Sequence, residues 1–110
     1  MSRENVRTGG AISVTAIYSI EAAEGKAEEL LAILKQGRDF TATVDGSESF
    51  DVFQGMDDPH KFVMVEHWNS VEAHQTHFEM NVKGAGVLDT AEALMAKPFP
   101  PPQESYYLLR

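Results

Sequence analysis

Apolar and polar residues alternate along some stretches of the chain and recur every three to four residues along others. β-Branched residues alternate through residues 12–20, which predicts a first strand. Residues 26–36 follow Gly25 with the i, i+3, i+4, i+7 apolar spacing of one helical face, and we expect this helix to extend toward residues 40–43. Gly46 suits the turn that follows, because glycine readily adopts a positive φ.

The central part of the chain, residues 50–77, predicts two strands, a tight turn between them and a helix. Residues 50–55 and 62–68 each alternate with the period of two of a pleated strand. An Asp-Asp-Pro sequence lies between them at residues 57–59. It predicts the turn, because aspartates bond their own backbone in turns and proline cannot donate to a sheet. The Asn-Ser pair at 69–70 offers helix-capping side chains to the segment that follows.

The last third of the chain predicts a second helical region and a final strand. Two glycines in residues 81–86 indicate a break or kink, and residues 87–95 resume helical spacing. The proline-rich residues 97–102 end the helix, and residues 104–109 predict a short strand. The order β-α-β-β-α-β predicts an α+β fold: a ferredoxin-like, antiparallel four-stranded sheet with the helices on one face.

The opposite face of that sheet is apolar as well. Ile17, Phe53, Val63 and Val65 fall on it by alternation. Two such sheets can cover each other by packing face to face. We therefore expect a homodimer formed through the sheet.

Size and composition limit the class of protein. The 110 residues fit one domain at residues 11–110, preceded by a flexible tail at residues 1–10. No stretch approaches the roughly 20 apolar residues of a membrane span, and the N-terminus has no apolar signal core. We expect a cytoplasmic protein with no membrane partner. A net charge of −8 argues against nucleic acid as a partner, and the absence of cysteine excludes disulfides and thiol chemistry.

Side chains that could take part in acid–base chemistry or ligand binding lie together in the central part of the chain. Glu66 shares one strand face with Trp68, and His77 follows on the next helix. A carboxylate on an apolar face has to be paired, hydrogen-bonded or solvated within a cavity. One interpretation is structural: Glu66 pairs with a helix side chain, Trp68 fills core and His77 lies on the surface. The other is a small-molecule site between sheet and helices, in which Glu66 and His77 meet.

Glu66-x-Trp68, followed nine residues later by His77, is the most specific part of a longer pattern. The pattern also contains Gly46, Phe50, Asp57-Asp58-Pro59, Phe62-Val63, Ser70 and Ala73. Over residues 12–109 the chain resembles the antibiotic biosynthesis monooxygenase family, whose small members include quinol and anthrone oxygenases that need no cofactor. The resemblance implies a ferredoxin-like fold that pairs into a dimeric α+β barrel.

The resemblance also implies a reaction: oxygenation of a small phenolic or quinol-like aromatic substrate by dioxygen, without flavin, haem or metal. An electron-rich aromatic anion reacts with dioxygen itself, so the protein has to bind it, remove a proton and exclude water. We expect His77 to be the base or hydrogen-bonding partner and Glu66 to orient it. The expected substrate-binding residues are Trp68, Phe50, Met64, Tyr18 and Gln54.

Three features bear on the branch of the family and on metals. Met64 stands where some of its oxygenases carry an asparagine, four residues before the tryptophan. The haem-degrading branch uses an asparagine on the first strand and a haem-binding histidine late in the second helical region, and this chain has neither. His60, His67, His74 and His77 lack a familiar metal-ligand spacing, so we expect solvated histidines and no metal.

Two other functions stay open on such a scaffold, because one fold hosts many chemistries. The first is a binding or stress-related module that holds a small aromatic or lipid-derived ligand without turnover. The second is a cofactor-free isomerase or decarboxylase. Oxygen consumption separates an oxygenase from both.

Overall fold

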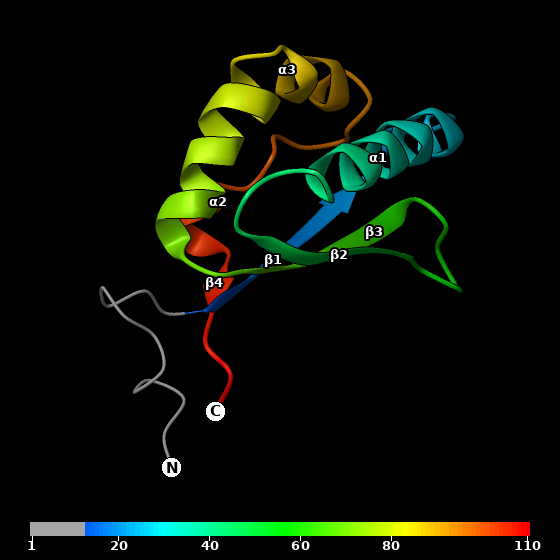
Figure 1. Ribbon diagram of the computed structural model, residues 1–110. Helices are drawn as coiled ribbons and strands as arrows, with labels where there is room; N and C mark the ends of the chain where they lie inside the picture. Colours follow the sequence, from blue (N-terminus) through cyan, green and yellow to red (C-terminus); the bar gives the residue numbers. More distant parts are fainter. Residues whose placement is uncertain (1–12) are drawn as a thin grey trace.

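Four strands form one antiparallel sheet in the order β2-β3-β1-β4. The computed structural model describes residues 13–110, so the predicted tail at residues 1–10 lies outside the described residues. Helices α1, α2 and α3 lie on one face of the sheet (Figure 1). The α+β, ferredoxin-like prediction is therefore confirmed. The strands are β1 (Val14–Glu21), β2 (Ser47–Gln54), β3 (Lys61–Trp68) and β4 (Tyr106–Tyr107).

The helical segments follow the predicted order. Helix α1 runs over Ala27–Thr41, within the range that its apolar spacing predicts. After β3 the chain forms α2 (Val71–His77), which continues directly into a π-helical segment, η3 (Phe78–Lys83). A turn leads to α3 (Val87–Glu92), and the proline-rich connector contains a short 3₁₀ helix, η4 (Pro102–Glu104).

The break in the second helical region comes later than predicted. Residues 81–83 still belong to η3, and the turn begins at Gly84. The N–H of Gly84 donates to the carbonyl oxygen of Glu79, five residues earlier, at 2.8 Å. A Cβ on Gly84 would lie 2.7 Å from that oxygen. The glycine therefore closes the wide helical turn. The final strand is also shorter than the predicted residues 104–109, since only two residues pair with β1.

The hydrophobic core lies between the sheet and the helices. Burial along β3 follows the predicted period of two: Phe62, Met64, Glu66 and Trp68 are buried, and the residues between them are more exposed. The neighbouring strand β1 turns its own buried residues to the same side. The rest of this core comes from Ala16, Tyr18, Ile20, Ala22, Leu30, Leu34, Ala91 and Met95.

Gly46 sets how closely α2 approaches the start of β2. Its φ is 93°, and a Cβ there would lie 2.6 Å from the Cβ of Ala73 and 3.0 Å from Oδ1 of Asn69. The carbonyl oxygen of Gly46 accepts a hydrogen bond from the Asn69 N–H at 2.8 Å. Ser70 caps α2 by accepting from the Ala73 N–H at 3.1 Å. These contacts fix α2, which carries two histidines, against the sheet.

The face of the sheet away from the helices carries the predicted apolar residues. Phe53 and Tyr107 are each 54% exposed on that side. Ile17, Val63 and Val65 are only partly covered. In residues 13–110 no helix is both long and apolar enough to span a bilayer.

Candidate active site

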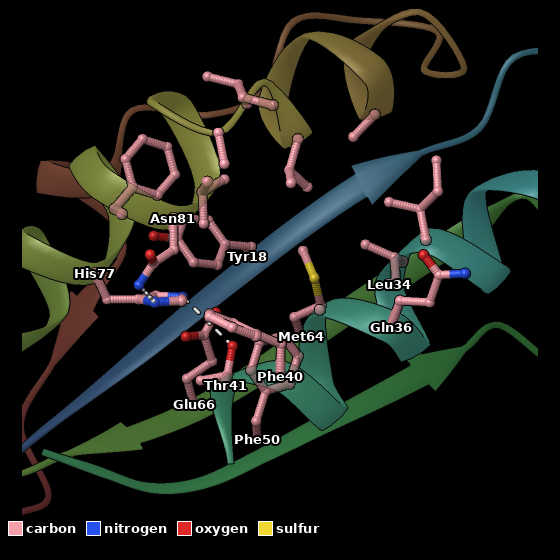
Figure 2. A pocket seen from close by; sticks show the side chains of 18 of the residues that line it. Tyr18, Leu34, Gln36, Phe40, Thr41, Phe50, Met64, Glu66, His77 and Asn81 are labelled. Atoms are coloured by element: carbon pink, nitrogen blue, oxygen red, sulfur yellow. Dashed lines mark hydrogen bonds between the residues drawn. The ribbon is translucent and has the colours of Figure 1, made fainter. Parts of the chain in front are cut away.

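A cavity of about 350 Å³ lies between the sheet and the helices (Figure 2). Its walls are largely apolar, with Phe50 from β2, Met64 from β3, and Ile33, Leu34 and Phe40 from α1. The opposite wall comes from η3, α3 and the connector after α3. Small-molecule sites span about 300–1,000 Å³, so this cavity suits a compact ligand. The polar residues that reach it are Tyr18, Gln36, Thr41, Glu66, His74, His77 and Asn81.

Glu66 brings a carboxyl group to the floor of the cavity. It lies near the middle of the sheet, between Ala16 of β1 and Phe50 of β2, and is only 5% exposed. The indole Nε1–H of Trp68 donates to Glu66 Oε1 at 3.0 Å. Burial raises the pKa of Glu66 to about 7, and the hydrogen bond from Trp68 opposes that rise. Near neutral pH the carboxyl group can therefore both hold and release a proton.

His74 is the histidine that meets Glu66. Its Nε2 lies 3.7 Å from Glu66 Oε1 and 3.1 Å from the hydroxyl of Tyr18, and its Nδ1 lies 2.7 Å from the hydroxyl of Tyr106. Burial, and secondarily the neighbouring His77, lowers the pKa of His74 to about 4. The imidazole is therefore neutral at pH 7, and its contact with Glu66 is not an ion pair. Burial also raises the pKa of Tyr18, which stays protonated.

His77 lines the same cavity one helical turn further on. Its Nδ1 lies 3.0 Å from Nδ2 of Asn81, and its Nε2 lies 3.4 Å from Oγ1 of Thr41. Burial lowers the pKa of His77 as well. From the sequence we expect Glu66 to contact His77. In the structure the imidazole within 4.0 Å of Glu66 is that of His74 instead. Helix α2 begins three residues after Trp68, so its first turn, with His74, lies beside the end of β3.

The predicted substrate-binding residues divide into three groups. Phe50, Met64 and Tyr18 line the cavity, as Figure 2 shows. Trp68 is fully buried behind it, where its ring centroid lies 5.3 Å from that of His74 and 5.2 Å from that of His77. Gln54 lies away from the cavity. Its Nε2 donates to the carbonyl oxygen of Pro59, in the β2–β3 turn, at 2.7 Å.

Several residues that define the site were not assigned to it from sequence. The sequence predicts a solvated His74 and does not place Thr41, Asn81 or Tyr106 at the site. Asn81 could have been found, because it follows His77 by four residues and such pairs are neighbours on a helix. Thr41 and Tyr106 come from distant parts of the chain, and their positions depend on how the elements pack. No spacing in the sequence indicates them.

The prediction that all four histidines are solvated is wrong, because two of them are buried. His74 is 1% exposed and His77 is 5% exposed, whereas His67 bonds Thr15 on the other face of the sheet and His60 lies at the hairpin turn beside Asp58. Among the described residues no three histidine, aspartate or glutamate side chains gather in a group that could hold a metal ion.

The sequence profile of antibiotic biosynthesis monooxygenases matches residues 13–82. The match spans more than half of the chain and contains Glu66, Trp68, His74 and His77. The chain therefore belongs to the antibiotic biosynthesis monooxygenase family.

Solved structures share the fold. SnoaB, a cofactor-independent oxygenase from Streptomyces nogalater whose structure is that of a mutant, is similar with a TM-score of 0.74 and 15% identity over 91% of this chain and 95% of its own. A Nitrosomonas europaea protein named after the same family is similar with a TM-score of 0.73 and 22% sequence identity. The match covers 82% of this chain and 86% of that protein. A Chloroflexus aurantiacus protein, also named after the family, is similar with a TM-score of 0.65 and 26% sequence identity. The match covers 81% of this chain and 86% of that protein. No curated protein sequence matches significantly.

Proposed function

We propose that this protein is a cofactor-independent monooxygenase that acts on a small phenolic, quinol-like or anthrone-like substrate with dioxygen. One observation carries the proposal: a buried carboxyl group, Glu66, has a pKa raised to about 7 and opens on an apolar cavity of about 350 Å³. A general base works best when its pKa lies near the working pH. An apolar chamber excludes water from the anion that the base produces.

Glu66 rather than His77 is the base in this proposal. Burial raises the pKa of Glu66 and lowers that of His77, so the carboxylate is the stronger proton acceptor near neutral pH. His77 keeps the second role expected for it, that of a hydrogen-bonding partner to the substrate. Phe50, Met64 and Tyr18 pack the substrate ring.

The reaction balances without a further reductant. Glu66 removes one proton from an acidic O–H or ring CH₂ group, and the resulting anion gives electrons to dioxygen. For a ring CH₂ group, loss of two protons and four electrons and gain of one oxygen atom yields a carbonyl, and dioxygen accepts the four electrons. Of the two oxygen atoms, one becomes the carbonyl oxygen and the other leaves as water. The protein supplies proton transfer, orientation and a dry environment.

Oxygen uptake with a panel of quinols and anthrones tests the proposal. We expect uptake that needs the protein, and we expect Glu66→Gln to lower it by about 10²-fold or more, since a positioned acid–base group contributes roughly 10²–10⁴-fold. His77→Ala should lower it by less, because it removes a hydrogen bond to the substrate and leaves the base in place. Gln54→Ala is the matched control, because Gln54 is a predicted site residue that the fold holds away from the cavity. Unchanged turnover in Glu66→Gln would remove the base from the mechanism.

A non-catalytic binding module is the second candidate. It is favoured by three hydrogen bonds, from Trp68 to Glu66, between Tyr18 and His74, and between His74 and Tyr106. These partners satisfy the buried polar groups without any ligand. Saturable binding of the same aromatics without oxygen consumption would support that function. A product of unchanged oxidation state would support an isomerase.

We also propose a homodimer formed through the face of the sheet opposite the helices. The partly exposed Ile17, Phe53, Val63, Val65 and Tyr107 support it. A second copy of the chain presents a matching apolar face, as a two-fold dimer interface requires.

A further inference from the structure

We infer that Asn81 holds His77 as the Nε2–H tautomer and so makes it a hydrogen-bond donor to an oxygen atom of the substrate. The inference deepens the proposed function, on which its substrate rests. It makes Asn81 a positioning residue that acts through His77, and it adds a requirement for the ligand.

The hydrogen bond between the two side chains carries the inference. Nδ2 of Asn81 lies 3.0 Å from Nδ1 of His77 (Figure 2). An amide nitrogen only donates, so Nδ1 must be the acceptor. A neutral imidazole carries a single ring proton, and that proton is then on Nε2. Burial lowers the pKa of His77, which favours the neutral ring.

Packing keeps the ring in this orientation. Phe40 stacks on one side, with centroids 6.4 Å apart and planes at 24°, and Trp68 lies 5.2 Å away at 31°. Nε2 reaches Oγ1 of Thr41 at 3.4 Å, a long hydrogen bond. A ligand oxygen at the usual 2.7–3.2 Å would make a better partner for the Nε2–H, since hydrogen bonds weaken with distance.

The π-helical segment brings Asn81 to this place. Asn81 lies in η3, four residues after His77, and η3 starts directly where α2 ends. Segments of π-helix often occur at functional sites. Both residues line the inner cavity, and both also line a shallow depression on the outer surface next to Val44 and Ser70. The pair therefore forms part of the wall between the two.

The donor role specifies the ligand chemistry. His77 provides an N–H, and Glu66 provides a group that accepts a proton in the same cavity. The preferred ligand is an aromatic ring with a carbonyl or phenolate oxygen for His77 and an acidic O–H or C–H for Glu66. Anthrone-type ketones and quinol monoanions have both. An unsubstituted aromatic hydrocarbon has neither.

Long-range ¹H–¹⁵N correlation spectra of the imidazole rings in the full chain test the tautomer directly. Loss of one ring system in His77→Gln assigns the signals of His77. We expect the Nε2–H pattern for His77 at pH 7. The Nδ1–H pattern in the unsubstituted protein would overturn the inference, whatever the turnover.

Two variants test the role of Asn81. In Asn81→Asp the carboxylate only accepts, so Nδ1 must carry a proton. Because burial favours the neutral ring, we expect His77 to shift to the Nδ1–H form, which leaves Nε2 without a proton. In Asn81→Ala no side chain selects a tautomer, and we expect a mixture. Unchanged His74 signals show that the fold persists, because His74 bonds Tyr18 and Tyr106 and does not bond Asn81. A His77 tautomer that stays the same in both variants would overturn the inference.

A binding measurement separates this inference from the proposed function. The probes are a non-oxidisable aromatic ketone and the same ring system without the carbonyl. We expect the unsubstituted protein to prefer the ketone and Asn81→Asp to lose roughly five-fold of that preference, the range of one net hydrogen bond. Equal preference in both proteins would overturn the donor role. Retained preference without any oxygen uptake would reject the oxygenase and leave the donor role intact.

Discussion

Glu66 combines deep burial with an ionisable group, and its environment explains how the fold tolerates it. The carboxyl group accepts from Trp68 and lies 3.7 Å from a neutral imidazole, so it has partners in both protonation states. The rise of its pKa to about 7 means that burial disfavours the charged form. The residue that serves the reaction therefore costs the protein stability when it ionises.

The stability cost of Glu66 gives a pH-dependent prediction. The folded pKa of about 7 lies above the ordinary value of 4.5, so the native state binds more protons between these values and stability falls as pH rises through them. We expect Glu66→Gln to be more stable than the unsubstituted protein at pH 8, by about 3 kcal/mol at most, and equal to it near pH 4.5. Urea denaturation at several pH values measures this difference.

His74 provides the opposite dependence in the same experiment. Its folded pKa of about 4 lies below the ordinary 6.5, so its contribution is lost as pH falls from 6.5 toward 4. In the unsubstituted protein the two effects partly cancel. Glu66→Gln should therefore lose stability on acidification more steeply than the unsubstituted chain. Parallel stability curves for the two proteins would show that Glu66 is not held in a raised-pKa environment.

Individual residues of the site could be predicted only on the strands, where the alternation of side chains fixes the face of the sheet on which each residue lies. Glu66, Phe50, Met64 and Tyr18 face the cavity because every second residue of a strand shares one face. Gln54 obeys the same alternation but does not line the cavity, and its side chain bonds the β2–β3 turn instead. Whether His74 or His77 meets Glu66 depends on the rotation of α2 about its axis. The sequence does not fix that rotation, because it leaves the start of the helix uncertain by a few residues.

At the scale of elements, the contact between Gly46 and α2 decides how the histidines sit over the sheet. We expect Gly46→Ala to destabilise the fold by about 2–4 kcal/mol, since it adds strain at a positive φ to a close contact with Ala73. Gly25→Ala is the matched control. Its φ is 76° but nothing lies within 4 Å of the added Cβ, so it carries the backbone strain alone.

Thermal or urea denaturation of the two glycine variants separates the steric effect from the backbone effect. Gly46→Ala should lose more stability than Gly25→Ala. Equal losses in both would mean that the approach of α2 to β2 is not as close as the structure has it.

The sequence predicted the identity and order of the elements better than their ends. Strong periodicity marked β1, α1 and β3 because each buries one face, and β2 because it turns the partly buried Phe50 and Val52 to one side. The π-helical η3 could not be predicted, since its apolar spacing does not differ from that of an ordinary helix over six residues. The glycines after it indicated an interruption, but the first of them closes the wide turn instead of kinking the helix.

At the scale of the whole molecule, the sheet face away from the helices is the surface that the proposed homodimer would cover. We expect Phe53→Glu to shift the protein from dimer to monomer, because a charge would be buried against an apolar partner face. Met56→Glu is the control. Met56 is another exposed apolar residue, 99% exposed and outside strands β2 and β3.

Analytical ultracentrifugation at micromolar concentration measures the effect of both variants. We expect a monomer for Phe53→Glu and a dimer for Met56→Glu. A dimer that survives Phe53→Glu would place the interface elsewhere on the molecule.

The central claim is that a buried carboxyl group in an apolar chamber activates an aromatic substrate for direct reaction with dioxygen. Turnover of an anthrone or quinol under ¹⁸O₂, followed by mass spectrometry across pH 5 to 9, tests it most directly. The account predicts one ¹⁸O atom per product and a rate above the protein-free reaction that rises with pH through about 7, the pKa of Glu66, and is lost in Glu66→Gln. Product without ¹⁸O, or the same pH profile in Glu66→Gln, would contradict it.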